Sequence, residues 1–226
     1  VQCMQDFNQS ADVQAFGLQA ISNLELSDQD CADIARHNFI HVAMDAMCGF
    51  PEDLELQVYG CRAIWNASGI PENQCLFVEE GVLGVVLKVM SDFVTNSELQ
   101  EQGLAVLANL GAAEENVGRL HECGAVARLV ETMNRHASNG QVQVKGCLAM
   151  TNMASHPTAP KKQMVEAGGG SAIVISMVMH PSDPEIQEKA LCALRNLSAD
   201  SEENRVELTN IGGIDAIISA MQVHRD

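Results

Sequence analysis

The feature that most constrains the fold of this chain is an internal repeat of about 43 residues. One asparagine recurs five times, at Asn23, Asn66, Asn109, Asn152 and Asn196. A glutamine lies nine residues before each of these asparagines, and a glycine lies six residues before the first four. Self-similarity at this period is typical of helical units that stack in a row, because one unit alone cannot bury its apolar face.

Each unit has the same internal order of helix and loop signals. The segment that carries the asparagine has helical periodicity, and a polar loop and a short apolar segment follow it. Next comes a residue suited to a left-handed helix end; these are Asn38, Gly81, Gly124, Gly168 and Gly212. A strongly apolar segment follows and ends near a recurring methionine, at Met4, Met47, Met90, Met133, Met177 and Met221. Asp183 and Pro184 suit the N-cap and first turn of the last long helix. The pattern predicts a short helix, a second helix and a long third helix in each unit.

Three helices in such a unit, with an asparagine in "ALRNL" and a glycine before the second helix, resemble the armadillo repeat. The resemblance covers essentially the whole chain. It implies an all-α fold, a right-handed α-solenoid of about five repeats with three helices each. We expect one armadillo domain over residues 1–226, with residues 1–11 ending a preceding repeat. The expected units, each running from third helix to second helix, are 12–54, 55–97, 98–140, 141–184 and 185–226.

Composition excludes several classes of function. The net charge of −17 argues against a general nucleic-acid binder, which needs a basic face. No window approaches the roughly 18 apolar residues that a membrane span requires. The eight cysteines are scattered singly without a CxxC pair, mostly in apolar runs. We therefore expect buried free thiols in a reducing compartment, the cytoplasm or else the nucleus, and no cofactor.

The helical wheel of the third helix separates a core side from the side that bears the asparagine. The glycine six residues before the asparagine lies on the core side. A glycine inside a helix costs about 1 kcal/mol relative to alanine, so its recurrence predicts a second helix too close for a Cβ. The recurring methionine is interpreted as core filler. The recurring glutamine also points inward, and we expect its amide to bond loop backbone between units.

The asparagines face away from this core. The armadillo resemblance implies that third helices line a concave groove in which asparagine amides bind the backbone of an extended peptide. An amide offers both a donor and an acceptor, so it pairs with a peptide unit of any sequence. The alternative is that the asparagines make only local helix contacts. The candidate groove residues are Asn23, Tyr59, Arg62, Trp65, Asn66, Asn109, Lys145, Asn152, Lys189, Arg195 and Asn196.

Neighbouring positions predict what the groove prefers. Tyr59, Arg62 and Trp65 are of the residue types that most often dominate binding energy. Trp65 lies at the rim, and packing against the next repeat is the alternative for it. Seven residues before each asparagine stand Phe16, Tyr59, Gln102, Lys145 and Lys189. The basic residues predict a preference for acidic ligand side chains in the C-terminal half.

Two departures limit the functional hypotheses. Importin-α-type repeats, which bind nuclear-localisation signals, carry a tryptophan four residues before the asparagine. That position holds Gln19, Arg62, Ala105, Leu148 and Cys192, so a nuclear-import adaptor is disfavoured. No polar capping helix is visible at either end, so we expect flanking sequence to continue the array; self-association through the uncapped ends is a further possibility.

Signals for an enzyme are weak. His37 and His41 could share a helix face for a metal, but no third ligand is apparent, and solvent-facing or loop contacts are favoured. The run "AGGGSA" could bind an anion, although a turn explains it more simply. We therefore predict a non-enzymatic scaffold that binds a protein or peptide segment in extended conformation. The alternative is a regulatory or targeting module of a larger multidomain enzyme, such as a kinase or ubiquitin ligase.

Overall fold

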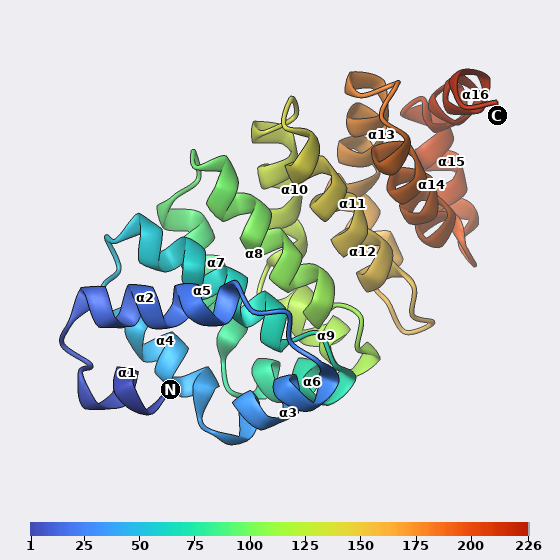
Figure 1. Ribbon diagram of the computed structural model, residues 1–226. Helices are drawn as coiled ribbons and strands as arrows, with labels where there is room; N and C mark the ends of the chain where they lie inside the picture. The colour runs from blue at the N-terminus through green and yellow to red at the C-terminus, as the bar shows by residue number, and fades with distance from the viewer. Residues whose placement is uncertain (226) are drawn as a thin grey trace. The chain divides into compact units, whose positions relative to one another are not determined.

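The computed structural model describes residues 1–225, and in that range it contains sixteen α-helices and no strand (Figure 1). The all-α prediction is confirmed. The helices are α1 (Gln2–Asp6), α2 (Ala11–Ser22), α3 (Asp28–Arg36), α4 (Phe39–Gly49), α5 (Leu54–Ala67), α6 (Pro71–Glu79), α7 (Val82–Asp92), α8 (Ser97–Leu110), α9 (Glu114–Glu122), α10 (Ala125–Arg135), α11 (Gly140–Ala154), α12 (Lys161–Glu166), α13 (Gly169–Met179), α14 (Pro184–Ser198), α15 (Glu202–Asn210) and α16 (Gly213–Val223). None of these helices is long and apolar enough to span a membrane.

The helices recur in the predicted order of short, second and long third helix. The third helices are α2, α5, α8, α11 and α14, and each begins one residue before an expected unit start. The chain divides into two compact units, Val1–Asn116 and Val117–Asp226. In the first unit α5 packs between α2 and α8, and in the second α14 packs on α11. The division into one domain stays a prediction.

Local signals set where these helices begin and end. The residue before each complete second helix has a positive φ, as predicted: 62° at Asn38 and 80° to 91° at the four glycines. Each third helix is capped by a side chain that accepts a backbone N–H of its first turn. The capping residues are Ser10, Asp53, Asn96, Asn139 and Asp183. In "AGGGSA", Gly168 takes the left-handed position, which supports the turn interpretation.

The second and third helices approach too closely for a side chain at the recurring glycine. A Cβ added to Gly103 would lie 2.6 Å from the Cγ of Met90, which is fully buried. The same overlap, at 2.7 Å or less from a methionine Cγ, occurs at Gly17, Gly60 and Gly146. The recurring glycine and methionine are therefore one contact made four times, as the sequence predicted for the glycine.

The recurring glutamine joins the same second and third helices by hydrogen bonds. Gln57 Nε2 donates to the carbonyls of Met47 at 2.8 Å and Phe50 at 3.0 Å, which lie at the end of α4 and in the loop that follows. The other four glutamines make the same two bonds at 2.8 to 3.0 Å. The expected bonding to loop backbone is confirmed. A buried carbonyl without a partner is costly, so these bonds hold the loop in one conformation.

A second set of buried asparagines joins the third helix to the next short helix. Asn73 Nδ2 donates to the carbonyls of Ala67 at 2.7 Å and Cys31 at 2.9 Å. Asn116 repeats this with Leu110 and Gln74, both at 2.9 Å. Sequence reasoning missed this set, although its spacing from the first asparagine was visible.

The cysteines are all free, but the expectation that they are buried is only partly right. Cys31, Cys61 and Cys147 are buried, whereas Cys3, Cys48 and Cys123 are exposed and Cys75 and Cys192 are half-buried. Cys3 and Cys48 are each next in sequence to a buried methionine, and an apolar neighbour in the sequence does not show on which side of the helix the thiol lies. Burial raises the pKa of the Cys61 and Cys147 thiols to about 12.

This difference predicts selective alkylation. With a pKa of about 12, only about one Cys61 thiol in ten thousand is ionised at pH 8. Iodoacetamide at pH 8 should therefore modify exposed Cys48 rapidly and modify Cys61 and Cys147 only after unfolding in urea. Peptide mass mapping over time measures each rate. Equal rates at Cys48 and Cys61 in native buffer would contradict the described packing.

The contact between glycine and methionine predicts opposite effects at two helical glycines. Gly103→Ala should lower the free energy of unfolding by about 1 kcal/mol, because overlap with Met90 outweighs the gain in helix propensity. Gly84→Ala is the matched control: a Cβ there meets nothing within 4 Å, so it should stabilise by about 0.5–1 kcal/mol. Urea denaturation measures both. Equal stabilisation by the two variants would show that the Met90 side chain can move aside without a loss of stability.

Candidate protein-interaction surface

The predicted groove residues of the first unit lie on α2, α5 and α8, on what we call the third-helix face. Tyr59 on α5 is half-buried. Its hydroxyl accepts from Gln19 Nε2 at 2.6 Å and donates to Glu55 Oε1 at 3.1 Å. The bond to the Glu55 carboxylate is the main cause that raises the pKa of Tyr59, so the hydroxyl stays protonated. Tyr59 thus links two neighbouring third helices through polar contacts that water or a ligand can also reach.

Arg62 lies one turn further along α5 and pairs with the next third helix. Its Nη2 is 3.1 Å from Glu98 Oε1 at the start of α8, and the Arg62 side chain is 29% exposed against 61% for Glu98. Sequence reasoning missed Glu98, because it lies 36 positions away from Arg62 in the chain. Ion pairs as exposed as this contribute about 0.2–1 kcal/mol. The guanidinium can therefore exchange Glu98 for a ligand carboxylate at small cost.

Trp65 completes the cluster on α5. Its side chain is half-buried, between the fully buried Ile64 and the half-buried Asn66. Its carbonyl oxygen accepts from Asn109 Nδ2 at 3.0 Å. Contact with a partner and packing against a neighbouring repeat both stay open as predictions for the indole.

Among the predicted asparagines, Asn66, Asn109 and Asn196 each bond to a neighbouring third helix. Asn66 Nδ2 donates to the carbonyl of Ser22 at 2.9 Å, and Asn196 Nδ2 donates to that of Thr151 at 3.0 Å. Asn109 Nδ2 donates to Trp65 and also to Ser68 Oγ at 3.1 Å. Each receiving carbonyl stands one position before the asparagine of the preceding repeat. These side-chain amides thus connect neighbouring repeats by hydrogen bonds. The role of the asparagines in peptide binding stays a prediction.

The other two asparagines differ in exposure. Asn23 caps the C-terminal end of α2 and is exposed, while Asn152 on α11 is half-buried. Together with Asn66, Asn109 and Asn196 they form what we call the asparagine ladder. The side-chain amides of Asn66 and Asn109 already donate hydrogen bonds to carbonyls within the protein. A side-chain amide also has a carbonyl oxygen that can accept a hydrogen bond.

The second unit carries the predicted basic residues. Lys145 on α11 and Lys189 on α14 are half-buried, and Arg195 is exposed. Lys189 Nζ lies 2.9 Å from Glu188 Oε1, and this hydrogen bond is the main cause that raises the lysine pKa. Arg195 Nε and Nη2 both lie 3.3 Å from Asn196 Oδ1. Lys189 therefore stays protonated and cationic, and the preference of this region for acidic ligands stays a prediction.

One expectation about the face is wrong. Gln102, which was placed on the groove side of the third helix, is only 5% exposed. Ala105 and Ala108 on the same helix are each 1% exposed. The wheel predicted the direction of these side chains but could not show that neighbours close over α8. These three residues of α8 therefore add little exposed surface to the third-helix face.

His37 and His41 make separate contacts within the chain. His37 Nδ1 lies 2.6 Å from the Asp33 carbonyl at the end of α3. His41 Nε2 lies 3.2 Å from Glu80 Oε2. No group of three His, Cys, Asp or Glu side chains among the described residues could hold a metal ion. Both histidines are exposed.

The repeated helix triplets and the asparagine ladder define an armadillo-type α-solenoid. The family described as "LRRK2 ARM repeat" matches residues 1–125, which is more than half of the chain. The chain belongs to this family. No curated protein matches the sequence.

Solved structures support the same fold. An engineered protein is 22% identical with a TM-score of 0.86, over 99% of this chain and 87% of that one. A computationally designed armadillo repeat protein for modular peptide recognition is 21% identical with a TM-score of 0.84, over 100% and 92%. A designed armadillo repeat protein in complex with the peptide (KR)4 is 20% identical with a TM-score of 0.79, over 94% and 85%.

The bonds of the ladder predict a stability difference between two asparagines. Asn66→Ala should lower the free energy of unfolding by about 1 kcal/mol, because the Ser22 carbonyl loses its donor. Asn23→Ala is the control, since Asn23 is exposed at the end of α2, and should change stability by less than about 0.5 kcal/mol. Urea denaturation checks both. An Asn66→Ala variant with unchanged stability would show that the hydrogen bond to the Ser22 carbonyl does not stabilise the fold.

Proposed function

We propose that this chain is a protein-interaction scaffold that holds an extended partner segment on its third-helix face. The observation that carries the proposal is the cluster on α5, where Tyr59, Arg62 and Trp65 lie half-buried beside Asn66. Half-buried aromatic and arginine side chains bind well because they lose little entropy and already sit in partly desolvated sites. We propose no catalytic step for these residues.

The cluster offers a partner three kinds of contact. The ladder oxygens accept backbone N–H groups irrespective of the ligand sequence. Arg62 can leave Glu98 for a ligand carboxylate, and it can hold that group through two parallel bonds. Tyr59 and Trp65 supply apolar area that excludes water from these bonds. Main-chain contacts would supply general affinity, and the α5 side chains would supply selectivity.

The basic residues of the second unit indicate which kind of peptide the scaffold would prefer. One neighbour of similar fold is a designed armadillo repeat protein in complex with the basic peptide (KR)4. On the present chain Lys145, Lys189 and Arg195 occupy the third helices of the second unit. These cations would repel such a ligand and attract an acidic one. We propose a partner whose segment is acidic where it meets α11 and α14, and not a nuclear-localisation signal.

The scaffold could also serve within a longer multidomain enzyme as a targeting or regulatory module. The fold accommodates both proposals, and the chemistry of the face is the same in each. Sequencing of the full transcript distinguishes them, because a kinase or ubiquitin ligase domain on the same chain would favour the module. We propose a cytoplasmic location, in keeping with eight free cysteines.

Substitutions on α5 test the binding face. Acidic and neutral peptides on an array identify a ligand, and fluorescence anisotropy then gives its Kd. Arg62→Ala and Trp65→Ala should each weaken binding about 10- to 30-fold, as for residues that dominate an interface. Arg62→Lys should recover only part of this loss, because lysine cannot make two parallel bonds.

The control is Arg36→Ala on α3. Arg36 also pairs with a carboxylate, that of Asp33 at 3.1 Å, but its side chain is 70% exposed on a short helix. It should leave the Kd unchanged. Full binding by both α5 variants would place the partner on another surface.

A further inference from the structure

A buried amide on α8 has an acceptor without a partner. Gln102 is 5% exposed, and its Oε1 is shielded from solvent and accepts no hydrogen bond from any described residue. Its Nε2 donates to Glu101 Oε1 at 3.4 Å. Gln57 and Gln143 also have an unpartnered Oε1, but two bonds through Nε2 hold each of those amides in place. Native proteins leave few buried acceptors unpartnered, so a donor for Gln102 has to come from a neighbouring side chain.

The spacing of the repeats shows which side chain lies beside Gln102. Gln19 on α2 donates to the hydroxyl of Tyr59 on α5 at 2.6 Å. Gln19 stands four residues before the asparagine of its own repeat, and Tyr59 stands seven residues before the next asparagine. One repeat later these two positions hold Arg62 on α5 and Gln102 on α8. Because α8 packs on α5 as α5 packs on α2, Arg62 is the neighbour of Gln102.

The contact between α2 and α5 shows the complete form of this arrangement. The Tyr59 hydroxyl accepts from Gln19 and donates to Glu55 Oε1 at 3.1 Å. The three side chains form a continuous line of hydrogen bonds from α2 to the start of α5. Tyr59, in the middle of the line, is bonded on both sides.

The contact between α5 and α8 has the same three positions without the middle bond. They hold Arg62, Gln102 and Glu98. Arg62 Nη2 donates to Glu98 Oε1 at 3.1 Å, while the Oε1 of Gln102 accepts nothing. Glu98 and Gln102 are four residues apart, so they lie on the same side of α8, about one turn from each other. Arg62 therefore has two acceptors within its reach on α8, one charged and exposed and the other neutral and buried.

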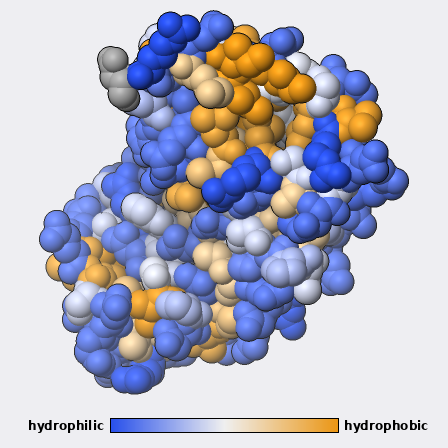
Figure 2. All heavy atoms as spheres, turned by 90° about the vertical axis from the view of Figure 1, so that its right-hand side faces the viewer, coloured by the Kyte–Doolittle hydropathy of each residue, from blue (hydrophilic) through white to orange (hydrophobic). Residues whose placement is uncertain are grey.

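In the second unit the equivalent positions hold different chemistry. On α11 and α14 they are Leu148, Lys189 and Glu185. Leu148 has no donor in its side chain, and Lys189 Nζ lies 2.9 Å from Glu188 Oε1. Figure 2 shows the side of the molecule on which α14 lies in Figure 1, and hydrophilic residues cover much of that surface. Lys189 is half-buried and has a charged partner, whereas the acceptor of Gln102 is buried and has none.

We propose that Gln102 is a second acceptor for Arg62, and that Arg62 turns to it when a ligand carboxylate displaces Glu98. The inference rests on the proposed function, because it concerns the same guanidinium on the third-helix face. The side chain of Glu98 is 61% exposed, so its pair with Arg62 is weak and easily exchanged. Two N–H groups of the guanidinium can bind the ligand carboxylate, and others remain for Gln102 Oε1. Gln102 is thus a positioning residue that acts on the ligand through Arg62.

This arrangement favours acidic ligands over neutral ones. A carboxylate draws Arg62 away from Glu98, and the buried amide of Gln102 then gains the donor that it lacks. A neutral ligand leaves Arg62 paired with Glu98, so it gains nothing from Gln102. Arg62 is bonded to α8 in both states, which keeps the loss of side-chain entropy on binding small. Gln102 therefore raises the affinity for acidic ligands without itself lying at the surface.

Removal of Glu98 tests the second acceptor without a ligand. Glu98→Ala releases Arg62, so in that variant Gln102 should accept its bond. Gln102→Met, which keeps the size and removes the amide, should then raise the unfolding equilibrium constant about 5-fold. In the parent the same substitution should leave that constant unchanged or lower it, because no bond to Oε1 is lost. Urea denaturation of the four proteins measures the difference.

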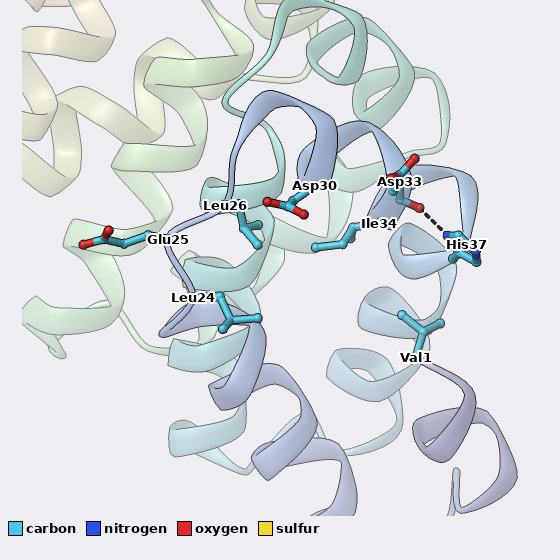
Figure 3. A pocket seen from close by; sticks show the side chains of 8 residues that line it. All are labelled: Val1, Leu24, Glu25, Leu26, Asp30, Asp33, Ile34 and His37. Atoms are coloured by element: carbon cyan, nitrogen blue, oxygen red, sulfur yellow. Dashed lines mark hydrogen bonds between the residues drawn. The ribbon is translucent and has the colours of Figure 1, made fainter.

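Asp33→Ala on α3 is the matched control. Asp33 pairs with Arg36 at 3.1 Å, as Glu98 pairs with Arg62, and Figure 3 shows it on α3. Gln102→Met should have the same effect in this variant as in the parent. A parent destabilised by Gln102→Met would show that the amide is already bonded. Equal effects of Gln102→Met with and without Glu98 would show that Arg62 does not turn to it. Either result would overturn the proposal.

Binding of two matched peptides separates this inference from the proposed function. The probes are an acidic peptide found on the array and its copy with amides in place of the carboxylates. Gln102→Met should raise the Kd of the acidic peptide about 5-fold and leave that of the neutral copy unchanged. In an Arg62→Ala background it should have no further effect, because Gln102 acts through Arg62.

The outcomes distinguish the two ideas. If Arg62→Ala weakens binding of the acidic peptide and Gln102→Met does not, the role of Gln102 is wrong and the scaffold proposal stands. An effect of Gln102→Met that persists in the Arg62→Ala background would likewise overturn its role as a positioning residue. If Arg62→Ala binds both peptides fully, the proposed function fails at this face, and the role of Gln102 in binding fails with it.

Discussion

The contact on which the structure depends is the close approach of each second helix to the third helix that follows it. In the first four of these helix pairs a buried methionine lies against a glycine that has no room for a Cβ, and in all five a buried glutamine bonds two carbonyls where the second helix ends. The methionine supplies dispersion contacts, and the glutamine satisfies backbone that would otherwise be buried without partners. Together they fix the angle between the helices, and every other feature follows from repeating that angle.

Successive repeats place their third helices side by side within each of the two compact units of the chain. Asparagine side chains join these neighbouring third helices by hydrogen bonds. Asn66 and Asn109 donate to carbonyls of the preceding third helix. The same side chain thus stabilises the array and contributes to its surface. Arg62 has a similar double character, since Glu98 holds it in place without burying it. Such a surface is preorganised, which lowers the entropy that a ligand must lose on binding.

The residues that sequence reasoning placed correctly are those governed by local rules. Left-handed residues such as Gly81 and caps such as Asp183 depend on a few neighbouring dihedral angles. The helical wheel failed at Gln102, because burial there depends on what packs over the helix. It also could not reveal Glu98 as the partner of Arg62.

The sequence by itself determined the period of the array, the three helices of each unit and the pairing of glycine with a close second helix. These follow from spacing, because a residue that meets the same neighbour in every repeat recurs in every repeat. Only the tertiary structure decided which polar groups are already bonded, among them the amide of Asn66 and the guanidinium of Arg62. Those outcomes depend on a neighbouring helix that lies about 40 residues away in the sequence, which the spacing within one helix does not reveal.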